Sequence, residues 1–180
     1  MITKEKLLEH SEADINSLIK IHPTYWNGAR YGILKKFCSG SKNLLSVGCG
    51  PKEPIILNSS HALDLSPLSE TYLRQKGWKG EFKIGSALAL PYEDKSFEVV
   101  VCSEVIEHLP TMEDVIQVMK EVSRVGRKWM ITTPNSAIIK PAAQNIHHLL
   151  FFTPEKIKEI LPFPAEITTH DYHIYIKGEI

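Results

Sequence analysis

Short apolar runs alternate with longer amphipathic segments along most of the chain. The short runs are typical of buried strands, whereas the longer segments repeat their apolar positions at helical spacing. The strands expected from this pattern are 44–47, 62–64, 81–84, 97–102, 128–133, 165–169 and 173–180. The helices expected are 3–20, 26–37, 53–58, 67–76, 104–109, 111–125 and 153–161, of which 104–109 is a single turn.

The order of these elements predicts the architecture of the sheet. Strands alternate with helices up to the last two strands, and this alternation is typical of a doubly wound, mostly parallel α/β sheet. The run 97–102, FEVVVC, is suited to a central parallel strand that is buried on both faces. The last two strands follow one another as a hairpin, so we expect the final strand to lie antiparallel to the others. Ser66, Thr111 and Thr153 are predicted N-caps of the helices that follow them.

The segment that joins the first two strands points to a ligand. The first strand ends in Gly48-Cys49-Gly50, where two residues lack a side chain and the backbone can approach a ligand closely. The second strand ends in Asp64, an acid suited to accept hydrogen bonds from ribose hydroxyls. The sequence Pro-Lys-Glu after the turn excludes a phosphate-binding loop, and Glu53 replaces the third glycine of the dinucleotide pattern. We therefore expect a ligand with an adenosine-like group and no pyrophosphate.

Composition narrows the class of protein. The chain has 180 residues, and we expect one domain, 1–180, with a helical leader or lid over 1–40 and a core over 42–180. Because the 21 Lys and Arg residues balance the 21 Asp and Glu residues, the charge disfavours nucleic acid as a partner. The three cysteines are typical of reduced thiols and the charged N-terminus differs from a signal peptide, which predicts a cytoplasmic location. No apolar run has the length needed to cross a membrane.

Three stretches of the sequence carry a family resemblance. They are LLSVGCGPKE, GSALALPYEDKSFEVVVCSEVIEHLP, and ITTPN followed by HHLLFFTPEKIKEIL, and the second is the most specific. Together they resemble the class I S-adenosylmethionine-dependent methyltransferases, in particular the branch that acts on small molecules. The resemblance covers roughly residues 42–180. It implies a Rossmann-like seven-stranded sheet and S-adenosyl-L-methionine as the cofactor.

The resemblance also implies which residues hold this cofactor. The glycine turn lines the methionine part with its backbone, an acid and a leucine at the end of the second strand hold the ribose and adenine, and a short segment after the third strand binds the adenine edge. Residues at the end of the fourth strand, with Glu104 after them, lie beside the sulfonium and the substrate entrance. The implied cofactor-binding residues are Gly48, Cys49, Gly50, Asp64, Leu65, Ser86, Ala87, Leu88, Cys102 and Ser103.

Three positions depart from the family pattern. Ser46 and Ser86 stand where the family usually has acids, and Lys52 stands at the third glycine of its loop. Each lost charge-assisted hydrogen bond would weaken cofactor binding by about 1.5–3 kcal/mol. These departures motivate an alternative hypothesis, a catalytically inactive binding or partner protein with the methyltransferase fold.

Histidines are the candidates for a catalytic base. Methyl transfer from a sulfonium is an in-line displacement, in which the protein supplies orientation and sometimes a base. His108, after the fourth strand, and His147 are the candidates, with His148 beside the latter. The alternative interpretation is structural: His108 ties its turn to the backbone, and the other two pack a surface or lid segment.

A metal site is a further alternative. Glu104, Glu107 and His108 form E-x-x-E-H, and at helical spacing they would share one face. With His147 or His148 they could bind a divalent ion, as in the methyltransferases that modify the 3′-terminal ribose of small RNAs. The alternative metal ligands are therefore Glu104, Glu107, His108 and His148, and the alternative activity is metal-dependent RNA ribose 2′-O-methylation.

Aromatic and cationic residues gather in the leader, namely Tyr25, Trp26, Arg30 and Tyr31. They either pack the leader onto the sheet or close it over the cofactor, with Arg30 facing the cofactor carboxylate. The leading hypothesis is an S-adenosylmethionine-dependent methyltransferase that acts on an O, N or C atom of a small-molecule acceptor.

Overall fold

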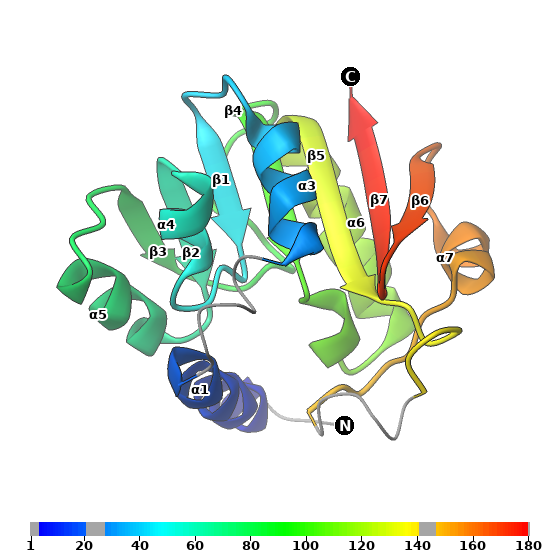
Figure 1. The fold of residues 1–180 in the computed structure, drawn as a ribbon, viewed down its shortest axis with the longest axis horizontal. Helices are drawn as coiled ribbons and strands as arrows, with labels where there is room; N and C mark the ends of the chain where they lie inside the picture. Colours follow the sequence, from blue (N-terminus) through cyan, green and yellow to red (C-terminus); the bar gives the residue numbers. More distant parts are fainter. Residues whose placement is uncertain (1–3, 21–27, 141–146, 180) are drawn as a thin grey trace.

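The computed structural model describes residues 4–20, 28–140 and 147–179. Figure 1 shows a twisted sheet with helices on both faces and α1 below its lower edge. The strands are β1 (Leu44–Val47), β2 (His61–Asp64), β3 (Glu81–Ile84), β4 (Phe97–Ser103), β5 (Gly126–Pro134), β6 (Glu166–His170) and β7 (His173–Glu179). The helices are α1 (Lys4–Lys20), α3 (Ala29–Cys38), α4 (Glu53–Leu57), α5 (Pro67–Gln75), α6 (Met112–Val125) and α7 (Pro154–Ile160), with a 3₁₀ turn, η1 (Ile106–His108).

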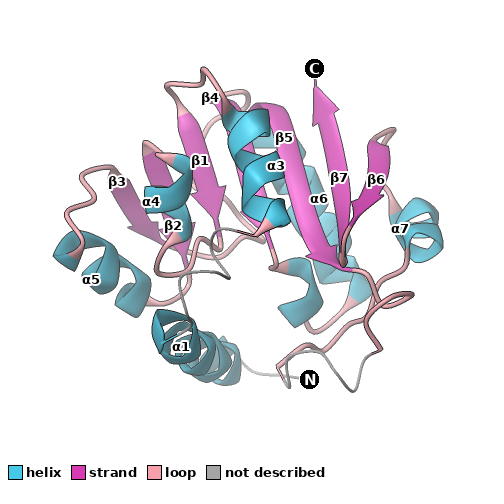
Figure 2. Cartoon of the chain, in the orientation of Figure 1, coloured by secondary structure: helices cyan, strands magenta, loops and turns pink. Residues whose placement is uncertain are grey.

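The predicted sheet is confirmed in class and direction. Its order is β3-β2-β1-β4-β5-β7-β6, and β1 to β5 pair parallel with their neighbours. β7 pairs antiparallel with both β5 and β6, as the terminal hairpin predicted (Figure 2). The C-terminal ends of β1, β2 and β4 therefore meet at one edge of the sheet, where doubly wound folds bind their ligands.

Separate helices cover the two faces of the sheet, because side chains alternate along each strand. Leu45 and Val100 face α6 and α7, in a core that includes Ile157 of α7. Leu44 and Val99, their neighbours in sequence, face α3 and α4 on the other side. The central strands are thus buried on both faces, as their apolar runs predicted.

The predicted helix starts at Ser66, Thr111 and Thr153 are confirmed. Each hydroxyl accepts a hydrogen bond from a backbone N–H of the first turn, at 3.2 Å, 3.1 Å and 3.3 Å respectively. Caps of this kind contribute about 1 kcal/mol each. The sequence therefore sets where α5, α6 and α7 begin.

Three differences from the predicted boundaries exceed one residue. β5 is longer than 128–133 because Gly126 pairs with β4 at its start and Pro134 pairs with β7 at its end. The segment 104–109 forms the short η1 turn in place of a full helical turn. α3 begins at Ala29, and the first residues of the predicted helix 26–37 lie outside the described residues. Within the described residues, no helix has both the length and the apolar character that a membrane span requires.

Candidate cofactor and acceptor site

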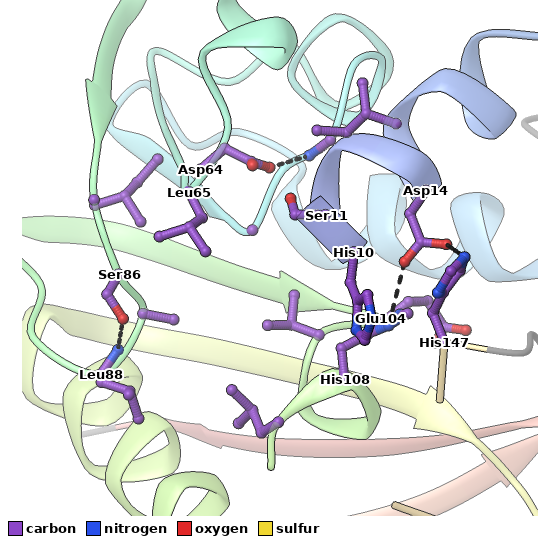
Figure 3. Close-up of a pocket in the computed structure, with 18 of the residues that line it drawn as sticks. His10, Ser11, Asp14, Asp64, Leu65, Ser86, Leu88, Glu104, His108 and His147 are labelled. Atoms are coloured by element: carbon purple, nitrogen blue, oxygen red, sulfur yellow. Dashed lines mark hydrogen bonds and ion pairs between the residues drawn. The ribbon is translucent and has the colours of Figure 1, made fainter. Parts of the chain in front are cut away.

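A cavity lies at the carboxyl ends of β1, β2 and β4. Its wall comes from the glycine turn after β1, the ends of β2 and β3, and the segment after β4, while α1 covers it from the outside (Figure 3). The side chains of Ile15 and Leu18 on α1 line the cavity, and Ile15 is almost fully buried. Lys52 donates a hydrogen bond to the carbonyl of Ile19, which ties the end of α1 to the glycine turn.

The glycine turn offers backbone to the cavity. Gly48 and Gly50 have φ values of 60° and 54°, which favour glycine. A Cβ at Gly48 would lie 2.4 Å from Cγ2 of Val105, so the two chain segments can approach only without a side chain there. Cys49 turns its side chain into the core beside Ala62, and burial raises the pKa of its thiol well above the usual range. Cys49 therefore contributes backbone to this turn and no reactive thiolate.

Asp64 joins the glycine turn to the end of β2. Its Oδ2 accepts a hydrogen bond from the Gly50 N–H at 2.8 Å, and its Oδ1 accepts one from the Ser66 N–H at 3.0 Å. Burial raises the pKa of Asp64, and these backbone donors oppose that effect. Asp64 also lines the cavity, so its carboxylate can face a ligand hydroxyl there.

The residues expected beside adenine come together at one end of the cavity. Leu65, Ser86, Ala87 and Leu88 all line it. The carbonyl of Asp64 accepts a hydrogen bond from Gly85, which fixes the segment after β3 against β2. The Ser86 hydroxyl accepts from the N–H of Leu88 at 3.2 Å. This end combines apolar side chains, which can pack against a purine ring, with a hydroxyl, which can hydrogen-bond to the edge of that ring.

Cys102 and Ser103 lie behind the cavity wall, although the family resemblance placed them beside the sulfonium. Cys102 is fully buried, and burial raises the pKa of its thiol well above the usual range. The hydroxyl of Ser103 accepts a hydrogen bond from Arg30 at 2.8 Å and lies 2.9 Å from the Thr132 hydroxyl. Of the three residues expected at this strand end, Glu104 is the one that lines the cavity.

Glu104 sits in a polar cluster at the ends of β4, β5 and β7. Its carboxylate lies 3.7 Å from Arg30 and 3.5 Å from His173, and it accepts a hydrogen bond from Thr132 at 3.0 Å. Burial acts to raise the pKa of Glu104, but Arg30, His173 and Thr132 outweigh it and lower the pKa to about 2. Glu104 is therefore a carboxylate at neutral pH.

Two further acids are buried behind this cluster. Burial raises the pKa of Glu53 to about 8, against the effect of Arg30 and the Ser46 hydroxyl. Burial also raises the pKa of Glu107 well above the usual range, and the charge of Glu104 adds to this effect. Within the described part of the chain, one oxygen of Glu53 and one of Glu107 accept no hydrogen bond. The sequence did not single out Glu53, because nothing in its apolar and polar pattern shows that this acid is buried.

Histidines from three segments meet Asp14 of α1 at the other end of the cavity. Nδ1 of His108 lies 3.4 Å from Asp14 Oδ2, and Nε2 of His147 lies 3.9 Å from Oδ1. The rings of His10 and His147 are 5.2 Å apart. Asp14 and His10 were not candidates in the sequence, because their roles depend on where α1 lies.

Three of the four alternative metal ligands lie close together in the structure. Ligand atoms of Glu107, His108 and His148 lie within 4.8 Å of one another. Glu104 does not belong to this group. The expectation that E-x-x-E-H shares one helix face is wrong, because Glu104 has a φ of 58° and precedes the η1 turn.

The leader reaches the site through Arg30 and Tyr31. Arg30 is buried and bound to Ser103 and Glu104, so its guanidinium lies at the cluster behind the cavity. Tyr31 packs in the core on the α3 side of the sheet. Tyr25 and Trp26 lie outside the described residues.

Comparison with known proteins identifies this arrangement. Residues 45–129 match the family model described as a methyltransferase domain. This match supports a class I S-adenosylmethionine-dependent methyltransferase. The match runs from β1 to β5, so it includes the glycine turn, Asp64 and the segment after β3. The cofactor of this methyltransferase family is S-adenosyl-L-methionine, and the cavity has the backbone turn, acid and apolar walls that fit it.

Individual relatives agree with this family. The chain is 28% identical over 117 residues to norajmaline N-methyltransferase of Rauvolfia serpentina, covering 58% of this chain and 40% of that protein. It is 27% identical over 154 residues to a probable S-adenosylmethionine-dependent methyltransferase of Mycolicibacterium smegmatis, covering 79% of this chain and 60% of that protein. The chain thus spans about half the length of these curated relatives.

A solved structure shows the same fold over nearly the whole chain. It is a SAM-dependent methyltransferase, possible histamine N-methyltransferase, from Thermotoga maritima. The TM-score is 0.74 at 12% sequence identity, and the match covers 96% of this chain and 99% of that one. The predicted methyltransferase fold is therefore confirmed from α1 to β7.

Proposed function

We propose that this protein transfers a methyl group from S-adenosyl-L-methionine to a small-molecule acceptor. The observation that carries the proposal is the cavity itself, which lies at the carboxyl ends of parallel strands and has an apolar, hydroxyl-bearing end and a charged end. The relative named norajmaline N-methyltransferase supports it. The free, buried cysteines support the further proposal of a cytoplasmic location.

The residues of the cavity have separate tasks in this proposal. Asp64 accepts the ribose hydroxyls, and Leu65 and Leu88 enclose the adenine between apolar surfaces. Bound at this site, the cofactor supplies an activated methyl group on a sulfonium. The main contribution of the chain is to hold the acceptor in line with that group, which lowers the entropic part of the barrier.

Helix α1 excludes water from the reacting groups. Ile15 and Leu18 present apolar side chains to the cavity, and they approach the glycine turn from outside the sheet. Removing water strengthens the electrostatic contacts within the site. The acceptor pocket therefore forms between α1 and the segment after β4.

Calorimetry with S-adenosylhomocysteine tests cofactor binding directly. We expect the wild-type protein to bind it and Asp64→Asn to bind at least about tenfold more weakly, because a neutral amide replaces a charged acceptor. Asp94→Asn is the matched control, since Asp94 is largely exposed and pairs with Arg124 outside the cavity. Absence of binding to the wild-type protein at about 0.5 mM would instead support an inactive, partner-binding role.

A second candidate function rests on the group formed by Glu107, His108 and His148. Two imidazoles and a carboxylate are a suitable donor set for a divalent transition metal. In this alternative the metal would serve ribose 2′-O-methylation of RNA. Titration with Mn²⁺, followed by electron paramagnetic resonance, should show a bound ion that is lost in His148→Ala. If wild-type and variant spectra are both those of free Mn²⁺, this candidate is discarded.

A further inference from the structure

The cavity has two chemically different ends. Leu65, Ser86 and Leu88 lie at one end, which we assign to the adenosine part of the cofactor. Figure 3 shows Asp14 and Glu104 at the other end, with the imidazoles of His10, His108 and His147 around them. A ligand that extends beyond the adenosine end would therefore meet a polar and acidic environment.

The described residues that line the second end include two carboxylates, of which Glu104 is paired with Arg30 behind the cavity wall. Asp14 and Glu104 contribute carboxylates, and none of the described residues that line the cavity is a lysine or an arginine. Such a lining attracts cations and repels carboxylates and phosphates. Imidazoles carry no fixed charge near neutral pH and offer both donors and acceptors.

The two carboxylates differ in their surroundings. Glu104 has a structural role, because Arg30, His173 and Thr132 all contact its carboxylate. Asp14 contacts imidazoles, at 3.4 Å from His108 and 3.9 Å from His147. The side chain of Asp14 is also 15% exposed, so a small molecule can reach it from the cavity.

Apolar side chains line the same cavity as Asp14. Ile15 and Leu18 follow it on α1, and Leu109 and Pro110 belong to the segment after η1. An acceptor in this space would place an apolar body against these residues and a cationic or hydrogen-bond-donating group against the carboxylate.

We propose that the acceptor is a basic amine with an apolar body and that Asp14 binds its nitrogen beside the methyl donor. The proposal rests on the proposed methyl transfer and names the substrate class of that site. It assigns to α1 a role in acceptor recognition in addition to covering the cavity.

The transfer balances as an amine methylation. The ammonium first releases one proton to solvent, which leaves a lone pair on the amine nitrogen. The nitrogen lone pair then forms the new bond to the methyl carbon, while the carbon–sulfur bond breaks and its electron pair remains on sulfur as a neutral thioether. The positive charge passes from sulfur to the methylated nitrogen, where Asp14 again faces it.

Matched probes test the proposal on the full chain loaded with S-adenosylhomocysteine. Saturation-transfer NMR would compare phenethylamine with 2-phenylethanol and phenylacetate, together with aliphatic and heteroaromatic amines and their alcohol and acid analogues. We expect amines to bind in preference to the other two classes. Asp14→Asn should weaken amine binding by about tenfold and leave alcohol binding unchanged. Glu9→Gln removes the same charge from an exposed position of α1 outside the cavity lining and should change neither.

The outcomes separate this proposal from the proposed function. If alcohols or acids bind as well as amines, if no amine binds, or if Asp14→Asn leaves amine binding intact, the amine proposal is overturned while methyl transfer stands. If Asp14→Asn lowers the affinity for S-adenosylhomocysteine, Asp14 belongs to the cofactor and the proposal is likewise overturned. Failure of the wild-type protein to bind S-adenosylhomocysteine would overturn the proposed function. Thermal denaturation of both variants shows that they are folded.

Discussion

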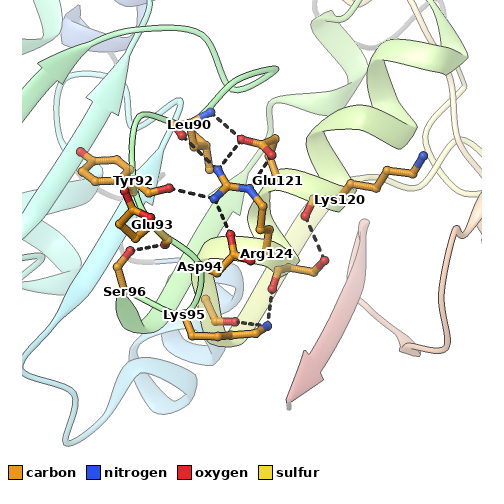
Figure 4. A network of polar contacts seen from close by, with 11 residues as sticks. Leu90, Tyr92, Glu93, Asp94, Lys95, Ser96, Lys120, Glu121 and Arg124 are labelled. Carbon is orange, nitrogen blue, oxygen red and sulfur yellow. Dashed lines mark hydrogen bonds and ion pairs between the residues drawn. The ribbon is translucent and has the colours of Figure 1, made fainter.

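Two arginines organise polar groups in different ways on the two sides of β4. Arg124, on α6, binds Glu121, Asp94 and the loop before β4, and we call this set the Arg124 network (Figure 4). Arg30, on α3, lies among Ser103, Glu104 and Glu53, which we call the Arg30 network. The first network holds a loop in place, whereas the second lies against the proposed site.

Donors and acceptors match in the Arg124 network. An arginine has five N–H donors. Those of Arg124 reach the carbonyls of Leu90 and Tyr92, the carboxylate of Asp94 and both carboxylate oxygens of Glu121, at 2.7–3.1 Å. These bonds raise the pKa of Arg124 and lower that of Glu121. The network fastens the loop 88–96 to α6.

Charges do not match in the Arg30 network and its surroundings. The guanidinium of Arg30 faces Glu104 and Glu53, and Glu107 lies buried behind them. The pKa values of these acids move apart: that of Glu104 falls to about 2 and that of Glu53 rises to about 8. Pairs of acids with separated pKa values are typical of functional sites.

This difference separates the parts of the stretch 85–110, which carried the most specific resemblance to the family. Its middle, LPYEDKSF, supplies Leu90, Tyr92 and Asp94 to the Arg124 network and does not line the cavity. Its two ends do line the cavity, with Ser86 and Leu88 at one end and Glu104 at the other. The proposed chemistry also uses α1, which contributes Asp14.

The largest expected effect is on stability, after removal of each arginine. Arg30→Met should lower the free energy of unfolding by about 3–5 kcal/mol, because it leaves the carboxylate of Glu104 without its cation. Arg124→Met should cost about 1–3 kcal/mol, since the side chain of Arg124 is 31% exposed and water can replace part of its network. Denaturation in urea measures both. If both variants lose the same free energy of unfolding, Arg30 is no more important for stability than Arg124.

A second test uses the pH dependence of stability. The pKa of Glu53 is raised to about 8 in the folded protein, so the folded state holds a proton that the unfolded state has released. Stability should therefore fall as the pH rises from about 5 to about 8, by about 1–3 kcal/mol. Glu53→Gln should reduce this slope.

Glu121→Gln is the control for that slope. Its hydrogen bonds from Arg124 lower the pKa of Glu121, so its stabilisation is present above the usual carboxyl pKa and is lost as the pH falls. This variant should lose stability at neutral pH and keep the slope between pH 5 and pH 8. Because burial also raises the pKa of Glu107, a reduced slope should remain in Glu53→Gln. An unchanged slope would show that Glu53 is not one of the titrating groups.

The sequence predicted the parts of the fold that depend on local patterns. Strand periodicity, the three N-caps and the terminal hairpin led to the sheet that the structure shows. The glycine turn and Asp64 were identifiable because φ values and acid placement follow from neighbouring residues.

The remainder of the site depends on tertiary contacts between distant segments. Asp14 is 94 residues before His108, and Arg30 is 73 residues before Ser103. No periodicity shows that α1 covers the cavity or that Glu53 is buried. The prediction that E-x-x-E-H shares one helix face failed for a local reason. Glu104 has a positive φ, so it is not helical, and helical spacing does not apply to it.

The smallest expected effect concerns the exposed end of the Arg124 network. Asp94 lies 2.8 Å from Arg124, but its side chain is 74% exposed. An exposed ion pair gains little over hydration and is screened by salt, so Asp94→Asn should lower stability by at most about 1 kcal/mol. The loss should shrink further when the salt concentration is raised to about 1 M. Because Glu121 and two carbonyls still bind Arg124, the loop should stay in place and S-adenosylhomocysteine should bind as to the wild-type protein. A loss as large as that of Arg124→Met would mean that Asp94 holds the whole network.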